Sequence, residues 1–329
     1  MEASIKKIED MSLNAWPSHK MELYDGWILR FSYFYTHRTN SVEQFGTSTL
    51  PWREKIPYCE NVYKRLGTPA IFKISPLVSP DFDYTLENRG YEIQHTTDVM
   101  TLSLDDARLT SAFNDVQFTE TIPDSWIFSL FNLKKMTDPV HREVVPSMYH
   151  AIPKETLCAS VQKNGKIIAT GLGILDRDYI GIYAIHVKEE FRGQGLARQI
   201  CTGLLKEGKK RGAENAYLQV VHGNAPARSL YTSLGFHDLY TYWFRVQPDT
   251  TKENNISRLR SYQTVCSCNN RTGRSINTTS CMGNRICNFW SKNFSCVPYT
   301  VLFSSTAEEL CPATIEVRGL KYRRQVSTQ

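Results

Sequence analysis

The N-terminal part of the chain alternates between short apolar runs and amphipathic stretches. The pair Asp25-Gly26 opens one apolar run, and Gly67 and Gly90 each follow an amphipathic stretch, as glycine often does at the end of a helix. The pattern predicts strands at 27–34, 70–74 and 91–104, and helices at 53–66 and 82–89. A polar connector at 105–115 separates this unit from the next.

A second unit follows, in which apolar runs and amphipathic stretches predict the order β, α, hairpin, β, α, β, α, β. The turn Lys163-Asn164-Gly165 lies between two apolar runs, as in a hairpin. The pattern predicts strands at 116–120, 157–162, 166–175, 179–187, 216–221 and 236–246, and helices at 123–135, 195–211 and 225–234. We therefore expect a mixed α/β fold of the α+β kind. Its domains would span 1–104 and 116–248, with a linker at 105–115 and an irregular tail at 249–329.

A short pattern occurs once in each unit: a helix, a glycine, an aromatic residue and a long strand. It stands at Leu86–Tyr91 and again at Tyr231–Phe236. We interpret the two units as copies of one fold, with each long strand closing its own unit. Chance is the alternative, because a glycine at the end of a helix is common.

The net charge of +6 is distributed unevenly along the chain. Residues 250–329 hold 11 Lys and Arg against 4 Asp and Glu, whereas residues 1–249 hold 28 against 29. The main body is therefore near neutral, which argues against a nucleic-acid-binding surface there. The basic tail shows no stacking pattern of aromatic residues, so we expect no nucleic-acid partner.

The cysteines and the apolar runs bear on metal, membrane and compartment. Six of the 9 cysteines stand in residues 250–329, without histidine and without C-x₂-C spacing, so we expect no metal site and a largely disordered tail. A disulfide-bonded or metal-binding appendix is the alternative. The first ten residues lack the apolar core of a secretory signal, and no run of 18 apolar residues exists. We therefore expect a cytoplasmic protein with free thiols and no membrane partner.

The strongest chemical signal is the segment Arg192-Gly193-Gln194-Gly195-Leu196-Ala197, between a predicted strand and an amphipathic helix. Glycines let backbone N–H groups surround an anion, and the helix N-terminus and the charges of Arg192 and Arg198 favour a pyrophosphate. The segment matches neither G-x-G-x-x-G, because Arg198 takes the last position, nor the P-loop. Taken alone, it also suits any tight strand-to-helix turn.

A second signal is the segment Asn224–Phe236. A purely structural interpretation accounts for its helix-capping, first-turn, core and helix-ending residues, which are Asn224, Pro226, Leu230, Leu234 and Gly235. That interpretation leaves Tyr231 as an ordinary helix residue.

Together the two segments resemble the GNAT N-acetyltransferase superfamily. In that family R/Q-x-x-G-x-G/A cradles the pyrophosphate of acetyl-CoA, and residues 192–197 match each fixed position. Residues 224–236 match the family pattern N-x-x-A-x-x-L-Y-x-x-x-G-F. The resemblance covers about residues 115–247 and implies an acyl-CoA N-acyltransferase fold with acetyl-CoA as co-substrate.

The resemblance also implies which residues form the site. The cofactor-binding residues would be Ile185, His186, Val187, Arg192, Gly193, Gln194, Gly195, Leu196, Ala197, Arg198 and Asn224. Backbone groups of 185–187 would bind the acetyl and pantetheine parts, and Asn224 would bind the pantetheine arm. Tyr231 would be the general acid, because the departing thiolate needs a proton and a phenol can donate one.

The general base is not evident from the sequence. A base is needed because a free ammonium, with a pKa near ~10, must lose its proton before it can attack. His186 is a candidate by residue type, although we favour a packed or solvated histidine there. Glu189 and Glu190 follow the predicted strand, and we interpret them as solvated charges.

The first unit resembles the N-terminal half of some two-domain members of the superfamily. The segments that carry this resemblance are 15–17, 24–31 and 38–42. This half lacks R-x-x-G-x-G/A, and Leu86 stands where the second unit has Tyr231, so we expect it to be degenerate. Arg30, Arg38 and Asn40 either contact the acceptor or are structural polar groups, and we favour the second interpretation.

Two functions fit these residues. The first is an N-acetyltransferase that transfers the acetyl group of acetyl-CoA to a primary amine of a small molecule or peptide. The second is a non-catalytic module that binds or senses acyl-CoA. Tyr231 next to an intact phosphate loop favours the enzyme, because binding alone does not need the phenol.

Overall fold

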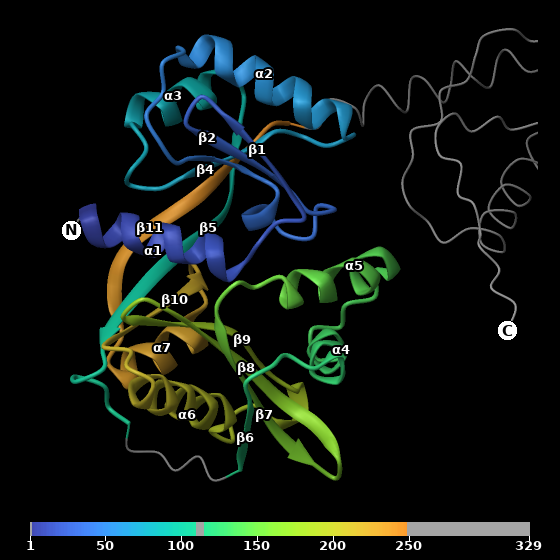
Figure 1. The fold of residues 1–329 in the computed structure, drawn as a ribbon, viewed down its shortest axis with the longest axis vertical. Helices are drawn as coiled ribbons and strands as arrows, with labels where there is room; N and C mark the ends of the chain where they lie inside the picture. Colours follow the sequence, from blue (N-terminus) through green and yellow to red (C-terminus); the bar gives the residue numbers. More distant parts are fainter. Residues whose placement is uncertain (1, 110–114, 249–329) are drawn as a thin grey trace, which may run out of the picture. The chain divides into compact units, whose positions relative to one another are not determined.

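The computed structural model describes residues 2–109 and 115–248 (Figure 1). The predictions for the tail at 249–329 and its cysteines lie outside these residues. The N-terminal half consists of α1 (Glu2–Ala15), β1 (Lys20–Tyr24), β2 (Trp27–Phe31), η1 (His37–Thr39), β3 (Val42–Gln44), α2 (Trp52–Arg65), β4 (Ile71–Ile74), α3 (Pro80–Asn88) and β5 (Glu92–Ser103). Every strand and helix predicted for this half is present, whereas α1, β1 and β3 are additional.

The C-terminal half likewise contains every predicted element. It consists of β6 (Val116–Thr119), α4 (Asp124–Leu133), α5 (Pro139–His150), β7 (Glu155–Lys163), β8 (Lys166–Asp176), β9 (Tyr179–Val187), η2 (Glu189–Phe191), α6 (Leu196–Lys210), β10 (Asn215–Val221), α7 (Ala225–Leu234) and β11 (His237–Val246). The helix α5 is additional, and the sequence does carry a signal for it: Asp138 caps it, and Pro139 occupies its first turn.

The strands of both halves join in one 11-stranded mixed sheet with the order β1-β2-β3-β4-β11-β5-β10-β9-β8-β7-β6. The pairs β3–β4 and β9–β10 are parallel, and the other neighbours are antiparallel. The two halves therefore share a continuous hydrogen-bonded sheet, which Figure 1 shows crossing between them along β5 and β11.

The long strands β5 and β11 are exchanged between the halves. β5 of the N-terminal half pairs with β10, with Asn215 opposite Ser103, and β11 of the C-terminal half pairs with β4, with Val246 opposite Ile71. The two exchanged strands also pair with each other in the middle of the sheet. The expectation that each long strand closes its own unit is therefore wrong, because each one completes the other half.

The helices cover both faces of this sheet. Successive residues of β4 point to opposite sides: Phe72 packs with α2 and α3, whereas Ile71 packs with α1. In the C-terminal half, α6 and α7 pack on one face, and α4 and α5 pack against the opposite side chains of β8. The core is consequently divided into four clusters, two on each face.

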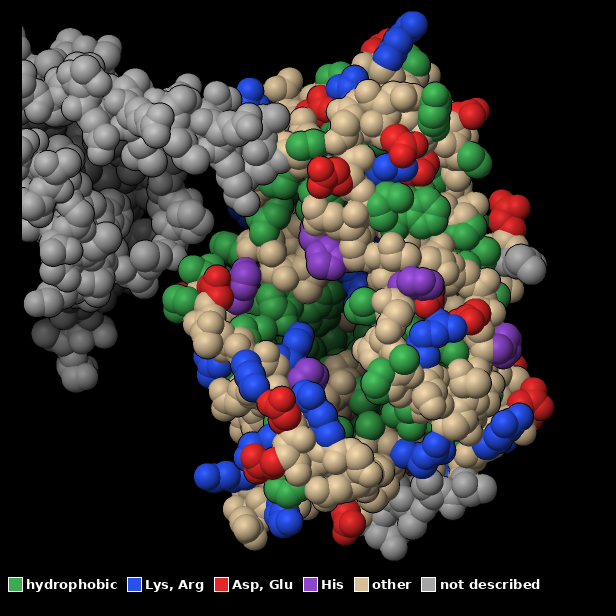
Figure 2. Space-filling view, turned by 180° about the vertical axis from the view of Figure 1, so that it is seen from behind, with side chains coloured by type: hydrophobic (Ala, Val, Ile, Leu, Met, Phe, Trp, Pro, Cys, Tyr) green, Lys and Arg blue, Asp and Glu red, His purple; other side chains and the backbone are tan. Residues whose placement is uncertain are grey.

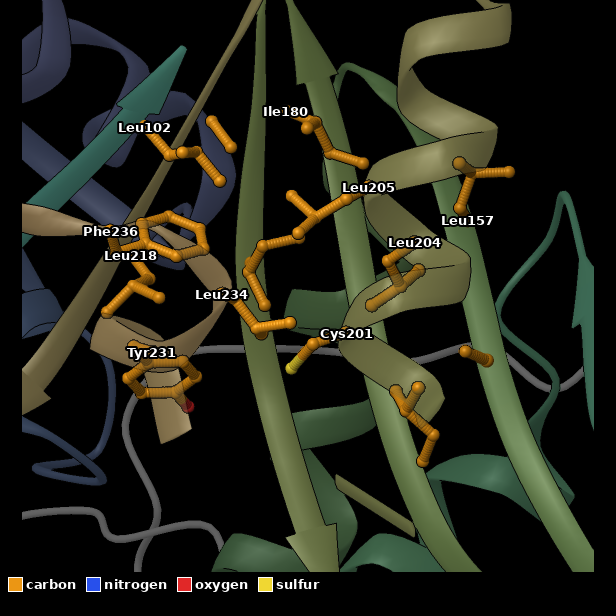
Figure 3. Packing of buried hydrophobic residues seen from close by; sticks show 14 of the residues in the cluster. Leu102, Leu157, Ile180, Cys201, Leu204, Leu205, Leu218, Tyr231, Leu234 and Phe236 are labelled. Atoms are coloured by element: carbon orange, nitrogen blue, oxygen red, sulfur yellow. The ribbon is translucent and has the colours of Figure 1, made fainter. Parts of the chain in front are cut away.

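The helix α6 lies unusually close to the sheet. Its buried residues recur at helical spacing, and Figure 3 shows Cys201, Leu204 and Leu205 facing the strands. Glycine at position 171 of β8 permits the approach, because a Cβ there would stand 2.3 Å from the Ile200 side chain. This contact fixes the start of α6, and with it the glycine-rich loop, relative to β8 and β9.

Polar contacts also tie the exchanged strands to the opposite half. Asp98 on β5 accepts hydrogen bonds from Arg228 at 2.6 Å, from Thr241 at 2.9 Å and from His222 at 3.1 Å. Together, these donors keep the pKa of the buried Asp98 carboxyl below its usual value, against the opposing effect of desolvation. The carboxylate thus joins β5, β11 and α7.

The cysteines and helices of residues 2–109 and 115–248 bear on the expected thiols and membrane contacts. Cys59, Cys158 and Cys201 are free and buried, and burial raises the pKa of each thiol to about 12. None of the helices in 2–109 and 115–248 combines the length and apolarity needed to cross a membrane. The cytoplasmic location stays a prediction.

Candidate active site

The parallel strands β9 and β10 separate part of the way along their length. Their pairing ends at Ile182 opposite Leu218, although β9 continues to Val187 and β10 to Val221. A bulge in β9 accompanies the separation, where Ala184 has a φ of 50° and the register with β8 shifts. Backbone groups beyond the split therefore lack a partner strand on one side.

The predicted phosphate loop follows directly after β9. Gly193 and Gly195 have φ of 76° and 79°, a region that favours glycine, and a Cβ on either would meet no atom within 4 Å. Gly195 is the N-cap of α6, and no side chain caps this helix, so its first N–H groups face open space. Arg192 bonds through Nε to the Val187 carbonyl at 3.3 Å, which anchors the loop to β9.

The loop residues that the sequence predicts are thus brought together between β9 and α6. Gln194 donates to the Glu190 carbonyl at 3.4 Å, and Leu196 and Ala197 form the first turn of α6. Arg198 bonds to Ser233, which connects α6 with α7.

The predicted helix α7 begins on the far side of the split, after β10. The Asn224 carboxamide oxygen accepts from the Ala227 N–H at 3.3 Å and so caps the helix, as the structural interpretation predicts. The Asn224 amide nitrogen has no hydrogen-bond partner among the described residues, and the side chain is exposed. One residue therefore caps a helix and keeps a free donor.

Tyr231 lies on α7 with its ring packed in the core cluster of the C-terminal half (Figure 3). Its ring meets Phe236 edge-on at 6.0 Å between centroids. Its hydroxyl makes no hydrogen bond to any residue that the structure describes, yet it is not among the fully enclosed unpaired atoms. Burial, and to a lesser extent Cys201, raises the pKa of Tyr231, so the phenol stays protonated at neutral pH.

His186 lies beyond the bulge and is held as a neutral imidazole. Burial lowers its pKa, as do the charges of Lys134 and Arg192, while a hydrogen bond to the Leu133 backbone has the opposite effect. Glu189 forms an exposed ion pair with Lys135 at 2.7 Å. Glu190 does the same with Lys188, also at 2.7 Å. These two carboxylates are solvated charges, as the sequence analysis expects.

A cavity of about 130 Å³ lies where the two halves meet, next to the split. Tyr183 and Gln219, the positions just past the last β9–β10 pair, line it from the C-terminal half together with Ala184. Figure 2 shows such a hollow, with hydrophobic side chains deep inside it and His, Lys and Arg side chains around its opening. Sequence spacing could not reveal this cavity, because its walls come from elements far apart in the chain.

The three polar residues considered for the N-terminal half have different roles. Asn40 is buried and its carboxamide bonds to the Ser32 N–H at 2.5 Å and the Thr36 carbonyl at 2.6 Å, so it is structural. Arg30 donates to the Arg38 carbonyl at 2.6 Å and to Glu43 at 3.2 Å. Arg38 bonds through Nε to the Tyr242 hydroxyl at 2.8 Å and lines the cavity.

The separated parallel strands, the bulge and the open glycine loop at an uncapped helix define a class of protein, the GNAT-type acyltransferases. Solved structures agree on the fold. A GCN5-related N-acetyltransferase from Kribbella flavida superposes with a TM-score of 0.57 at 13% identity, over 77% of this chain and 97% of that one. A tandem GNAT protein from the clavulanic acid biosynthesis pathway gives 0.50 at 12% identity, over 63% and 75%.

The chain belongs to the family described as "Probable histone acetyltransferase Rv0428c C-terminal", whose model matches residues 2–244. YobR of Bacillus subtilis (strain 168), described as an uncharacterized N-acetyltransferase, is 28% identical over 252 residues, which are 74% of this chain and 98% of YobR. The ribosomal protein bS18-alanine N-acetyltransferase of Escherichia coli (strain K12) is 36% identical over 76 residues, which are 23% of this chain and 51% of that enzyme. The protein is therefore an acetyltransferase, which favours the enzyme over the non-catalytic module.

Proposed function

We propose that the C-terminal half binds acetyl-CoA across the β9–β10 split and transfers its acetyl group to an amine held in the adjoining cavity. The observation that carries the proposal is the arrangement of the open loop at Gly193 and Gly195, the split beyond Ile182 and the cavity at Ala184. The open glycine loop, the gap in the sheet and the cavity all adjoin β9 and the loop that follows it.

The residues present fit acetyl-CoA. The pyrophosphate would bind the free N–H groups at the start of α6, with Arg192 and Arg198 adding positive charge. Backbone groups of 185–187 beyond the split, other than the Val187 carbonyl that accepts from Arg192, would bind the pantetheine arm and the thioester carbonyl. Asn224 would donate from its free amide nitrogen. Acetyl-CoA supplies the activated acetyl group. The described residues include no group of three or more His, Cys, Asp or Glu that could hold a metal ion.

In the proposed reaction the neutral amine attacks the thioester carbonyl, and backbone donors of β9 stabilise the oxyanion. The C–S bond then breaks, and the sulfur takes the phenolic proton of Tyr231. The ammonium proton of the acceptor passes to solvent, and the Tyr231 phenolate regains a proton from solvent. Burial raises the pKa of Tyr231, which keeps the phenol protonated before the step and also makes it a weaker acid than a free tyrosine. Among the described residues that line the cavity, Glu43 is the one carboxylate, and it is bonded to Arg30 and Lys73.

A matched pair of glycine variants tests the cofactor site. Gly195→Glu places a negative side chain in front of α6, and Gly212→Glu does the same behind its C-terminal end. Both glycines have positive φ, 79° and 90°, and open space around the missing Cβ, so the backbone strain is comparable. Calorimetry should show that CoA affinity falls at least tenfold, about 1.4 kcal/mol, only for Gly195→Glu. Equal affinities in both folded variants would refute the site.

A further inference from the structure

We propose that the acceptor is a small amine that carries a carboxylate, bound by Arg38 with Lys134 at the mouth of the cavity. The inference rests on the proposed acetyl transfer and names the substrate class for the same cavity. It follows from three features of the walls: the balance of charge, the free donors of Arg38 and the size of the apolar part.

Two cations of the cavity wall are already neutralised. Lys73 contacts Glu9 at 2.6 Å and Glu43 at 3.4 Å, and Arg30 contacts Glu43 at 3.2 Å. These four buried groups form a balanced network of two positive and two negative charges. They hold the cavity wall together and leave no charge for a ligand.

Arg38 and Lys134 are the cavity-lining cations for which no ion pair exists among the described residues. Arg38 uses only Nε, toward the Tyr242 hydroxyl at 2.8 Å. Its two terminal nitrogens have no partner within 2–109 and 115–248, and they are not among the fully enclosed polar atoms. A half-buried guanidinium with a free planar edge fits a carboxylate, which it can bind through two parallel hydrogen bonds.

Lys134 adds a second charge at the cavity opening, where its side chain is exposed and donates to the Tyr35 hydroxyl at 3.2 Å. Desolvation lowers the pKa of Lys134, and the charge of Arg38 lowers it further. Both cations line the same cavity. An anion bound between them would reduce their mutual repulsion, and no acidic side chain among the described residues pairs with either one.

The rest of the wall combines an apolar part with the polar side chains of Ser12, Thr36 and Gln219. Trp16 meets Tyr149 edge-on at 4.8 Å, and Leu172 and Ile174 of β8 complete this side. The cavity of about 130 Å³ is close to the engineered cavity of ~150 Å³ that holds benzene. It therefore takes an apolar body of roughly that size. A compact apolar group, a carboxylate at Arg38 and an amine toward Ala184 and the split together describe an acceptor like a free apolar amino acid.

The test uses the full chain and acetyl-CoA with matched acceptors. Alanine, leucine and phenylalanine are each offered as the free acid, as the amide, as the decarboxylated amine and as the N-terminal residue of a tripeptide. Release of CoA gives kcat/KM. The amide loses its ammonium proton more readily than the acid, so its intrinsic reactivity is the greater. A preference for the acid must then come from binding. For the best side chain, we expect kcat/KM to be at least tenfold higher for the acid than for the matched amide, amine or tripeptide.

Three variants connect this preference with the assigned residues. Arg38→Gln should lower kcat/KM for the acid at least tenfold, while changing kcat/KM for the decarboxylated amine less than twofold. Arg38→Lys should restore part of the loss, since it restores the charge without the planar edge. Lys134→Gln should lower kcat/KM for the free-acid acceptor selectively. Lys135→Gln changes a residue next to it but outside the cavity wall, and it should not lower this value. Circular dichroism and melting temperature confirm that each variant is folded.

The failures of the two proposals are distinguishable. The inference is overturned if amides, decarboxylated amines or tripeptides react as well as the acids. It is equally overturned if Arg38→Gln lowers kcat/KM for every acceptor by the same factor. It is also overturned if the parent protein binds CoA, and Gly195→Glu weakens that binding, but the parent acetylates no member of the panel. In these cases the proposed cofactor site stands. Loss of CoA binding by neither glycine variant would instead refute the proposed function itself.

Discussion

Replacing Tyr231 by phenylalanine distinguishes a role in proton transfer from a role in core packing. Tyr231→Phe deletes the hydroxyl and nothing else, and the structure allows the two consequences to be estimated independently. The ring keeps its contacts with the core cluster, including the edge-on contact with Phe236. Since the hydroxyl bonds to no described residue, its loss leaves no protein group unpaired.

We therefore expect the free energy of unfolding to change by less than about 0.5 kcal/mol, as for substitutions that break no specific interaction. Loss of a positioned proton donor typically lowers the rate by roughly 10²- to 10⁴-fold. The lower limit is about 2.7 kcal/mol on the activation barrier. The affinity for CoA should stay within about threefold, because the hydroxyl acts only as the C–S bond breaks.

The assay is kcat at saturating acceptor, with CoA affinity by calorimetry and stability by urea unfolding on the same samples. Tyr91→Phe is the control, a buried tyrosine of the N-terminal half whose hydroxyl donates to Glu60 at 3.0 Å. It should lose about 1.5 kcal/mol of stability, because a bond to a charged group is lost, and keep its kcat. Tyr231→Phe should thus lose activity and keep its stability, whereas Tyr91→Phe should lose stability and keep its activity.

A parent-like kcat in Tyr231→Phe would refute the proton-donor role and assign the protonation to water or another residue. A fall in CoA affinity as large as the fall in kcat would show instead that the hydroxyl holds the cofactor. Because burial keeps this phenol protonated, its ionisation should cause no decline of kcat between pH 7 and 9 in the parent enzyme.

Three more outcomes follow from the structure. Asp98→Asn should lower the free energy of unfolding by about 2 kcal/mol in urea titration, because Arg228 loses the buried one of its two anionic partners, at 2.6 Å, and keeps only the exposed Asp238; an unchanged midpoint would contradict a structural role for this carboxylate. Burial and the charge of His95 lower the pKa of His37 from 6.5 to about 4, so the unfolded chain binds the proton more tightly and stability falls as the pH drops from 6.5 toward 4. His37→Phe should make the urea midpoint less dependent on pH over that interval, and an equally steep dependence would exclude His37 as its source. Removal of residues 250–329 should leave CoA affinity and melting temperature nearly unchanged, since the family match ends at 244; a large drop in melting temperature would show that these residues stabilise the body.

The local elements of this protein follow from its sequence. β9, α6 and α7 lie where apolar periodicity and glycine place them, because strand and helix formation depend on contacts between residues near one another in the chain. The glycine-rich loop is predictable for the same reason, since positive φ at Gly193 and Gly195 is a property of the residues themselves. α1 also has a local signal, with Ile5, Ile8 and Met11 at helical spacing, which is weak in so short a segment.

The partners of the strands are decided only by the tertiary structure. The strands β5 and β11 are both long, and nothing in either pattern distinguishes β4 from β10 as a neighbour. Contacts such as Asp98 with Arg228 distinguish them, and these join residues 130 positions apart. The cavity depends on the same exchange, because it brings Arg38 and Lys134 from different halves to one wall. Residue spacing records neighbours along the chain, whereas an acceptor site is formed by neighbours in space.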